Sequence, residues 1–457
     1  MPFDYPRSAC RPQCAGEKAL KLNRRIVLVN FDFPPIQGPG VWRTLGFAAH
    51  LPKLGWGVSV IASDRPTWHS RIDPSLLGRI PAGVRVHRVR GRAAGSILQR
   101  VMPARVVRAW RDVLPSPVAI PALKMVALAL AHAPRKPFAI LTSGPPHVSH
   151  LVGLVLKRTH ACTWIADFRD LWMDDPEQAW AGWYQTRLGL ETELAVLHGA
   201  DTVVTVSPTW AEALRRKGGK APVHLIRNAA DATADALPPA ERPWPVTERV
   251  VLFAGTPQPN NTAWRFQGSG PDGKEDDLWE GIRRYLHSTT GGQAPVRFAF
   301  LGLNPAIHDR LARFGIAASV DDLGPQRHER ALALLQGADA ALVPQRTSGS
   351  EVSRGTIPAK IYQAMAAGKH IILLADPEGD AARMLAGYPH TLAAGNDPAA
   401  IAEAFRRFAE QAPASHESAI PPEFVAWSRH AATVELDRLI RELNPAFEPE
   451  SPPARRQ

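Results

Sequence analysis

Short apolar runs alternate with helical patterns along most of the chain. "RRIVLVN" (24–30) is rich in β-branched residues, and a turn-rich piece, a helical pattern from Val41 to Leu54 and a second apolar run, "GVSVIAS" (57–63), follow it. A buried run, a helix and another buried run make a βαβ unit, because parallel strands need a crossover between them. The alternation continues through the runs "RVHRV", "FAILTSGPP", "TWIADFRD" and "ADTVVTVS".

A Pro- and Ala-rich stretch, residues 226–248, interrupts the series and is predicted to be a linker. A second series then begins with "RVVLFAGT", "VRFAFLGL", "ADAALVPQ" and "KHIILLA". Strands that alternate with helices predict a parallel sheet covered on both faces. We therefore predict an α/β protein with two facing, doubly wound, Rossmann-like domains: an N-terminal domain at 24–225 and a C-terminal domain at 249–422.

The two ends of the chain and one internal stretch read differently. Residues 1–23 lack the apolar stretch of a secretory signal, so we expect a disordered leader there. Residues 257–277 are polar and Gly-rich, which is typical of a loop insertion. A terminal amphipathic helix is predicted at 423–443, and a disordered tail at 444–457.

Composition narrows the class of protein. Apolar residues make up 45% of the chain, enough for two sizeable cores. No apolar run approaches the roughly 18 residues that span a bilayer. The cysteines, Cys10, Cys14 and Cys162, give neither a disulfide framework nor zinc spacing. We expect a protein of the reducing cytoplasm.

The positive charge is concentrated in one region. Residues 85–136 hold eleven Lys and Arg against one acid, a net charge of +10 out of +11 for the whole chain. A nucleic-acid binder usually spreads its charge more widely, so we expect no nucleic acid and one acidic partner at this region.

Two helical patterns lie within the basic region, at 97–114 and 118–133. The first sets apolar positions beside basic ones, which is typical of a helix in the headgroup layer of an anionic membrane. The alternative is a helix packed on its own sheet with a solvated basic face. The residues predicted to face the membrane are Arg100, Arg105, Arg108, Trp110 and Arg111.

"TIPAKIYQAMAAG" (356–368) follows a predicted strand and has helical spacing. Pro358 suits its first turn and Gly368 the position past its end. The free N–H groups of such a helix start favour a phosphate, and Lys360 adds a full charge there. Gln363 shares a face with Lys360. A plain crossover helix with no ligand remains the alternative.

Three other loops follow predicted strands. "IQGPGVWR" (36–43) carries glycines that allow close approach of a ligand, and Arg43 at the helix start; a tight turn explains it almost as well. "TSGPPHVSH" offers His147 as a donor or base, with a surface role as the alternative. "DFRDLW" offers Asp167, Arg169 and Asp170, either for the acceptor side or as a structural ion pair.

Metal dependence is disfavoured by the sequence. No Asp-x-Asp triplet occurs in the chain, so a divalent cation held by such a triplet is not expected. A helix start and basic side chains offer another way to stabilise a leaving diphosphate. We expect neither a metal nor a cofactor.

Several of these segments occur together in one order. They are "NFDFPPIQGPGVWRT", "SGPPHVSH", "ADFRDLW", "ADTVVTVSP", "FAGT" and "GTIPAKIYQAMAAG". With them the chain resembles bacterial family 4-like glycosyltransferases of the GT-B fold, from about Arg24 to Leu443. The resemblance implies metal-independent, retaining transfer of a sugar from a nucleotide-sugar, which is a substrate and not a cofactor. It also implies a lipid-diphosphate-linked or glycan acceptor, in O-antigen or capsule synthesis on the inner face of the cytoplasmic membrane.

The resemblance also places individual residues. It puts the glycine loop and Thr256 near the donor, and it puts Gly355 and Gln363 where the wider family carries a Glu-x7-Glu pair. An amide at 363 still reaches a ribose hydroxyl, but without the charge of a carboxylate. The predicted catalytic residues are His147, Asp167, Arg169 and Lys360, and the predicted donor-binding residues are Gly38, Gly40, Arg43, Thr256, Thr356, Pro358, Lys360 and Gln363.

Two alternatives share the expected fold. A nucleotide-sugar 2-epimerase needs acid and base carboxylates in the cleft, and its chemistry gives the basic region no purpose. A non-catalytic scaffold or binding protein is suggested by the changes at both glutamate positions.

Overall fold

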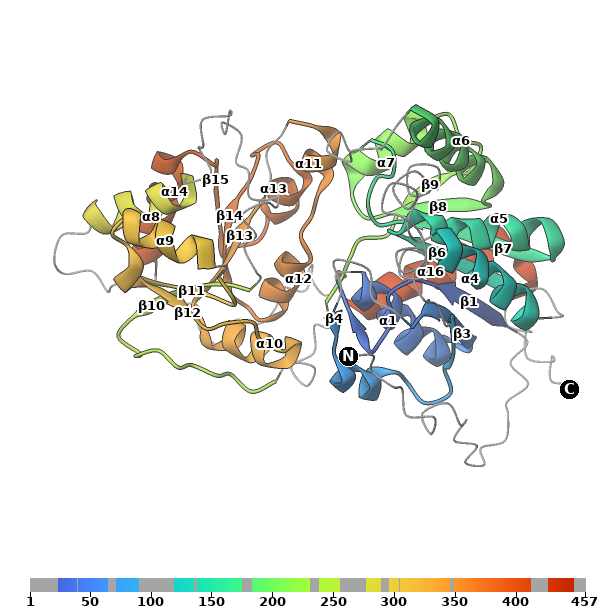
Figure 1. Cartoon of the computed structure of the whole chain (residues 1–457), viewed down its shortest axis with the longest axis horizontal. Helices are drawn as coiled ribbons and strands as arrows, with labels where there is room; N and C mark the ends of the chain where they lie inside the picture. Colours follow the sequence, from blue (N-terminus) through green and yellow to red (C-terminus); the bar gives the residue numbers. More distant parts are fainter. Residues whose placement is uncertain are drawn as a thin grey trace, which may run out of the picture.

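The computed structural model describes residues 24–38, 40–64, 71–89, 119–134, 138–174, 183–230, 238–254, 277–288, 296–303, 305–345, 349–411 and 426–447. Two α/β domains lie side by side (Figure 1). Thr256, the helix predicted at 97–114 with its five membrane-facing residues, and the leader lie outside the described residues.

The first domain is built on a seven-stranded sheet with the order β5-β3-β1-β6-β7-β8-β9, and all its pairs are parallel. From β1 the chain adds β3 and β5 on one side, and it then adds β6 to β9 on the other side. The order of the strands therefore reverses between β1 and β6, which is the switch point of this sheet. Its strands are β1 (Arg25–Val29), β3 (Gly57–Ser63), β5 (Arg85–Val89), β6 (Phe138–Gly144), β7 (Cys162–Phe168), β8 (Thr202–Thr205) and β9 (Val223–Leu225).

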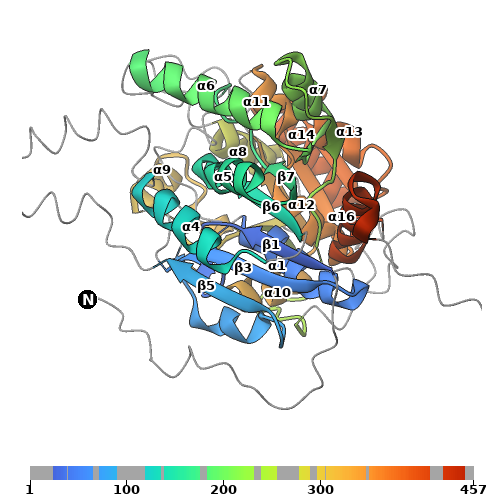
Figure 2. The same cartoon turned by 90° about the vertical axis from the view of Figure 1, so that its right-hand side faces the viewer.

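Helices cover both faces of this sheet. Figure 2 shows α4, α5 and α6 on one side and α16 on the other. The helices of this domain are α1 (Val41–His50), α4 (Ala119–His132), α5 (His150–Thr159), α6 (Trp183–Gly199), α7 (Pro208–Arg216) and α16 (Arg429–Leu443), with 3-10 turns at Leu51–Leu54, Pro74–Arg79 and His147–Ser149. A small antiparallel pair, β2 (Ile36–Gln37) and β4 (Arg71–Ile72), lies at its margin.

The second domain has a six-stranded sheet with the order β12-β11-β10-β13-β14-β15, again parallel throughout. Here the order switches between β10 and β13. The strands are β10 (Arg249–Phe253), β11 (Val296–Phe300), β12 (Val320–Asp322), β13 (Ala340–Pro344), β14 (His370–Leu374) and β15 (Thr391–Ala394). The helices are α8 (Asp277–Ser288), α9 (Pro305–Arg313), α10 (His328–Gly337), α11 (Glu351–Gly355), α12 (Ala359–Ala366), α13 (Asp380–Leu385) and α14 (Pro398–Glu410).

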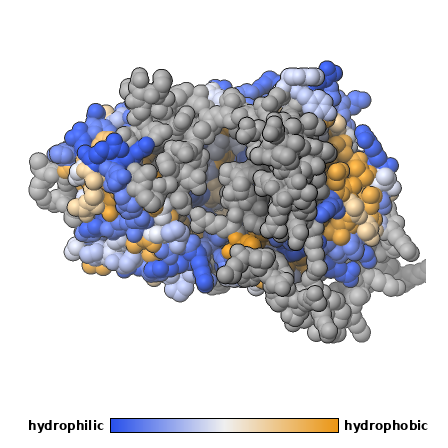
Figure 3. Space-filling view, in the orientation of Figure 1, coloured by the Kyte–Doolittle hydropathy of each residue, from blue (hydrophilic) through white to orange (hydrophobic). Residues whose placement is uncertain are grey.

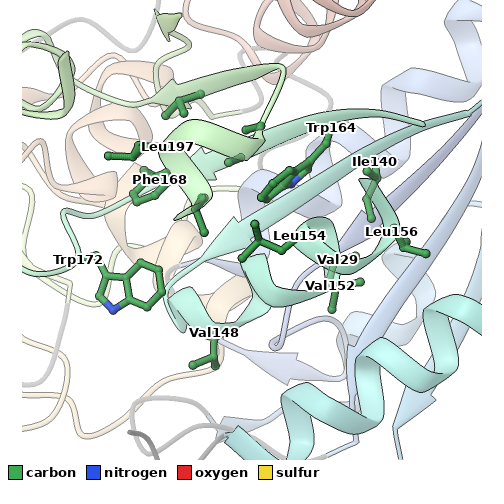
Figure 4. Packing of buried hydrophobic residues seen from close by; sticks show 14 of the residues in the cluster. Val29, Ile140, Val148, Val152, Leu154, Leu156, Trp164, Phe168, Trp172 and Leu197 are labelled. Atoms are coloured by element: carbon green, nitrogen blue, oxygen red, sulfur yellow. The ribbon is translucent and has the colours of Figure 1, made fainter. Parts of the chain in front are cut away.

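Each sheet has an apolar core on both faces, as the continuous apolar runs predict for buried parallel strands. Figure 4 shows one of the four cores, where Trp164 of β7 lies beside Ile140 of β6 and Leu154 of α5. The indole N–H of Trp164 donates to Thr142 Oγ1 over 2.9 Å, so its polar atom is satisfied inside the core. The GT-B architecture predicted from the sequence is confirmed.

The structure differs from the sequence expectation in one helix end, in three added edge strands and in the start of the tail. The helix expected over 41–54 is α-helical only to His50 and ends as a 3-10 turn at Leu54. The short edge strands β9, β12 and β15 were not foreseen. The disordered tail expected from residue 444 was wrong at its start: Pro445–Phe447 forms a 3-10 turn, and Phe447 is buried beside Trp56 because their rings pack 5.2 Å apart.

The C-terminal helix α16 returns to the first domain. Leu436, Leu439 and Ile440 lie in the core under β1 and β3, together with α1. The chain therefore crosses between the domains twice. The two crossings touch: Ala230 pairs with Ser428 in an isolated parallel bridge, and the Arg429 N–H donates to the Ala230 carbonyl over 3.2 Å.

Candidate active site

Helix α12 begins at the switch point of the second sheet, just beyond β13. Pro358 is its N-cap and no side chain caps it, so the first N–H groups of the helix have no side-chain partner. Gly368 follows its end with φ +63°, a left-handed backbone that glycine adopts without strain. The predicted helix is confirmed, and its buried face includes Ile361 and Met365. Its start is an anion-binding geometry.

Lys360 lies in the first turn of α12 and is half-buried. Its Nζ sits 4.0 Å from the centroid of the Phe253 ring, at the end of β10. Burial lowers the pKa of this ammonium group to about 8. No ion pair of Lys360 is found among the described residues. A desolvated cation with no ion pair in these ranges, at a helix start that no side chain caps, is suited to a phosphate.

Gln345, which sequence reasoning missed, holds the loop ahead of α12. It follows β13 and is 5% exposed. Its Nε2 donates to the carbonyls of Ser353 (2.9 Å) and Thr356 (2.6 Å). Thr356, predicted to bind the donor, donates its own hydroxyl to the Val352 carbonyl over 2.7 Å. The only sequence signal for Gln345 was its place at the end of a strand run.

Arg43 and Asp167 form a buried, bidentate ion pair across the first sheet. Arg43 Nε lies 3.0 Å from Asp167 Oδ2, and its Nη2 lies 2.9 Å from Oδ1. Asp167 also accepts from the Ser143 hydroxyl over 2.7 Å, and its side chain is 0% exposed. The third guanidinium nitrogen of Arg43 donates to the Arg227 carbonyl over 2.9 Å. Arg43 and Asp167 therefore bind each other, which matches the alternative of a structural ion pair that the sequence left open for Asp167.

Arg169 fills the space that Gly40 leaves open. A Cβ at Gly40 would lie 1.4 Å from Nη1 of Arg169, so no side chain fits there. Arg169 also donates from Nε to Ser143 Oγ over 2.9 Å and from Nη2 to the Pro145 carbonyl. Burial lowers the pKa of Arg169. The glycine loop is thus close-packed against the protein's own arginine, and Gly38 accepts from the Val41 N–H over 3.1 Å.

His147 and His150 are buried rather than exposed. His147 is 6% exposed and stacks on Trp172 with 5.1 Å between ring centroids, while His150 stacks on Phe168 at 4.7 Å. Burial lowers the pKa of His147 well below its ordinary value and that of His150 to about 3. His150 Nδ1 is bonded to Thr142 Oγ1 (2.8 Å). Both rings are neutral near pH 7, so His147 is placed as a neutral hydrogen-bonding group.

The structure brings the predicted residues together in two groups, one at each sheet's carboxyl edge. The first-domain group contains Gly40, Arg43, His147, Asp167 and Arg169. The second-domain group contains Thr356, Pro358, Lys360 and Gln363.

Tyr362 of α12 lies close enough to the first-domain group to feel its charges. Its hydroxyl is buried and has no hydrogen-bond partner among the described residues. Burial raises its pKa, while the charges of Arg227 and Arg43 from the first domain lower it. Within the same described ranges, no group of three or more His, Cys, Asp or Glu residues is arranged to hold a metal ion.

Comparison with known proteins places this site in a family. Residues 40–229, which contain the whole first-domain group, match the model of the glycosyl transferase 4-like domain. This part of the chain belongs to the glycosyl transferase 4-like domain family. Compared by sequence with curated proteins, this glycosyltransferase matches none of them.

Solved structures show the same two-domain GT-B fold. Sucrose-phosphate synthase from Thermosynechococcus elongatus is 16% identical, with a TM-score of 0.60 over 93% of this glycosyltransferase and 100% of that chain. WaaG, a glycosyltransferase involved in lipopolysaccharide biosynthesis, is 13% identical, with a TM-score of 0.52 over 92% and 98%. A putative UDP-N-acetylglucosamine 2-epimerase from Listeria monocytogenes is 11% identical, with a TM-score of 0.54 over 92% and 97%.

Proposed function

We propose that this glycosyltransferase moves a sugar from a nucleotide-sugar to a lipid-diphosphate-linked or glycan acceptor, with retention and without a metal, in cell-surface glycan synthesis. The observation that carries the proposal is Lys360, which has no ion pair among the described residues and lies at the uncapped start of α12. Charge develops on the diphosphate as the glycosidic bond breaks. A fixed ammonium group and helix N–H groups stabilise that charge without having to reorganise.

The role of the first domain follows from its packing. The Arg43–Asp167 pair and Arg169 fix the carboxyl edge of β6 and β7, and His147 is held neutral between Trp172 and Phe168. A neutral imidazole donates or accepts a hydrogen bond without carrying charge. We propose that this edge receives the sugar and acceptor while α12 receives the diphosphate, with Gln363 on the ribose.

A 2-epimerase is disfavoured by the same geometry. Epimerisation needs a free carboxylate or comparable base at the sugar, and Asp167 is buried and bound to Arg43 and Ser143. The two activities also differ in their products. Transfer releases the nucleotide as a diphosphate, whereas epimerisation leaves the nucleotide-sugar intact.

The outer face of the first domain supports a membrane-bound acceptor. Helix α4, which lies within the basic region, buries Ala122 and Met125 and exposes Leu123 (62%) and Leu130 (40%). At the start of α6, Trp183 is 77% exposed. Figure 3 shows apolar surface on the right-hand side of this domain. We propose peripheral binding to the inner face of the cytoplasmic membrane; no described helix has the length and apolar character needed to cross it.

The experiment that tests the proposed function is a thermal-shift screen with nucleotides and nucleotide-sugars, followed by an assay of nucleotide diphosphate release. A bound ligand raises the unfolding temperature by mass action. We expect one nucleotide-sugar to raise it, and its nucleotide to be released when a glycan acceptor is added. Binding without release in the presence of acceptors would favour the scaffold, and conversion of the sugar without release would favour the epimerase.

A further inference from the structure

Trp210 of the first domain is bound by the second domain. It lies in the first turn of α7 and is 3% exposed. Its indole N–H is shared between two carbonyls of α11, those of Glu351 (3.2 Å) and Val352 (3.3 Å). Figure 1 shows α7 and α11 side by side where the two domains meet. The side chain of Trp210 is thus buried in the contact between α7 of the first domain and α11 of the second.

The ring occupies the space next to Gly355, the last residue of α11. A Cβ at Gly355 would lie 2.2 Å from Trp210 Cδ1 and 2.3 Å from its Nε1. No side chain fits at this position while the domains are in contact. The glutamate that the resemblance implies at this place is therefore sterically excluded by Trp210.

The carbonyls that Trp210 binds belong to the segment that positions the start of α12. Val352 accepts from both the indole and the Thr356 hydroxyl. Gln345 holds the same segment from within the second domain, through Ser353 and Thr356. Lys360 follows directly. The segment 351–356, which leads into the start of α12, is thus held by Gln345 from its own domain and by Trp210 from the facing domain.

The residue next to Trp210 makes a second contact across the interface. The backbone N–H of Thr209 donates to Asp380 Oδ2 over 2.8 Å, and Asp380 is 3% exposed. A carboxylate at the start of α7 satisfies an N–H that the helix leaves unpaired and complements its dipole. Two successive residues of α7 therefore bind the second domain, which fixes the direction of approach of Trp210.

We infer that Trp210 is a positioning residue that couples closure of the two domains to the position of the donor-binding turn at α12. The inference rests on the proposed function, because it concerns the same site. When Trp210 is docked, the 351–356 segment is fixed and α12 is ready for the diphosphate. Because coupling is reciprocal, a bound donor must in turn favour the docked arrangement.

A double-mutant cycle at positions 210 and 355 tests the inference. Trp210→Ala removes the ring, and Gly355→Ala adds a methyl group that displaces it. Each single change should raise the KM for the donor about tenfold or more, with little change in the KM for the acceptor. The double variant should be no worse than Trp210→Ala, since the methyl group fits once the ring is gone. This non-additivity is the signature of direct contact. Additive losses, or an unchanged donor KM in an active protein, would overturn the inference.

Two further measurements keep the test independent of fold and activity. Trp210→Phe keeps most of the ring and loses both hydrogen bonds, and it should give a smaller rise in the donor KM than Trp210→Ala. Amide hydrogen exchange of residues 351–363 should become faster in Trp210→Ala and Gly355→Ala, and stay unchanged in the control Val246→Ala, at an exposed position. Unchanged exchange in both variants would refute the coupling, whether or not the protein transfers a sugar. A wild-type protein that transfers no sugar would refute only the proposed function.

Discussion

Lys360 and Arg43 are both cations near the carboxyl ends of strands, yet their surroundings give them opposite roles. Arg43 has all its nitrogens bound by the protein, to Asp167 and to the Arg227 carbonyl. Lys360 lies over a Phe253 ring and is desolvated without an ion pair in the described ranges. A cation that the fold leaves unpaired is available for a ligand, whereas a cation that the fold pairs holds the fold together.

Lys360→Ala should lower the rate of transfer about a hundredfold, because one preorganised charge on a leaving group contributes about 3 kcal/mol. The rate should also fall in the wild-type protein as the pH rises through about 8, the pKa of Lys360, because the neutral amine does not stabilise the diphosphate. That pH dependence should disappear in the variant. The control is Lys220→Ala, an exposed lysine. Full activity of Lys360→Ala would move the donor site elsewhere.

Arg43→Ala should instead unfold the first domain more easily. Removing one partner of a buried ion pair leaves an uncompensated charge, which costs about 3–5 kcal/mol. Urea unfolding monitored by circular dichroism measures the loss. Arg187→Ala, which breaks the exposed pair with Glu191, should barely shift the midpoint. A small effect at position 43 would show that Asp167 is not locked as the geometry indicates.

The sequence predicted some of these residues and not others for a physical reason. Pro358, Lys360 and Gly368 form a local pattern, so their helix and its start were predictable. The partners Arg43 and Asp167 are 124 residues apart, and no local pattern reveals that they pair. Gln345 holds the turn ahead of α12 through its side-chain amide. A Gln at the end of a strand gives the same sequence pattern when its side chain makes no such bonds, so the pattern did not predict this role.

At the scale of elements, the central strands were predictable because they are continuous apolar runs. Strands β9, β12 and β15 are short and lie at or near the edges of their sheets, where only part of each strand is buried. Their composition therefore carries little signal. Helix α4 was predicted as an apolar helix, and the structure shows which of its residues face the sheet and which face outward.

The outward face of α4 gives a prediction for membrane binding. Leu123→Asp with Leu130→Asp should reduce co-sedimentation with vesicles that contain anionic lipid, because both changes place charge on the exposed apolar face. Binding of the wild-type protein should weaken with salt. The matched control is Val246→Asp, an 89% exposed apolar position on the second domain. Equal binding to neutral vesicles, or none to either kind, would contradict a role for the basic region and α4.

At the scale of the whole molecule, the interface includes a second aromatic contact. Trp42 of α1 stacks on His328 of α10 with 4.0 Å between ring centroids. Burial and the charges of Arg79 and Arg429 lower the pKa of His328 to about 4, while Asp73 raises it. With Trp210 and Trp42, the first domain thus contacts the second through two tryptophans, at α11 and at α10.

Acid should therefore weaken the folded, closed protein. His147, His150 and His328 have lower pKa values in the folded state than the ordinary 6.5, so the unfolded state binds more protons as the pH falls below 6.5. Stability should be highest above that pH and should decline from about pH 6.5 to about pH 4. Urea midpoints measured across this range test it, and His328→Phe should flatten part of the decline while the exposed His198→Phe should not. A midpoint that stays constant in this range would show that these rings are not desolvated.

The return of α16 to the first domain has a mechanical consequence. Because the chain passes between the domains at 230 and again at 428, and the two passages are hydrogen-bonded to each other, the connection is a two-stranded strap rather than a single tether. A relative motion of the two domains must therefore carry both passages together. A protease that cuts one passage would leave the domains attached through the other. A fragment that stops before 426 would lack Leu436, Leu439 and Ile440, and the apolar face of the first sheet that they cover would be exposed.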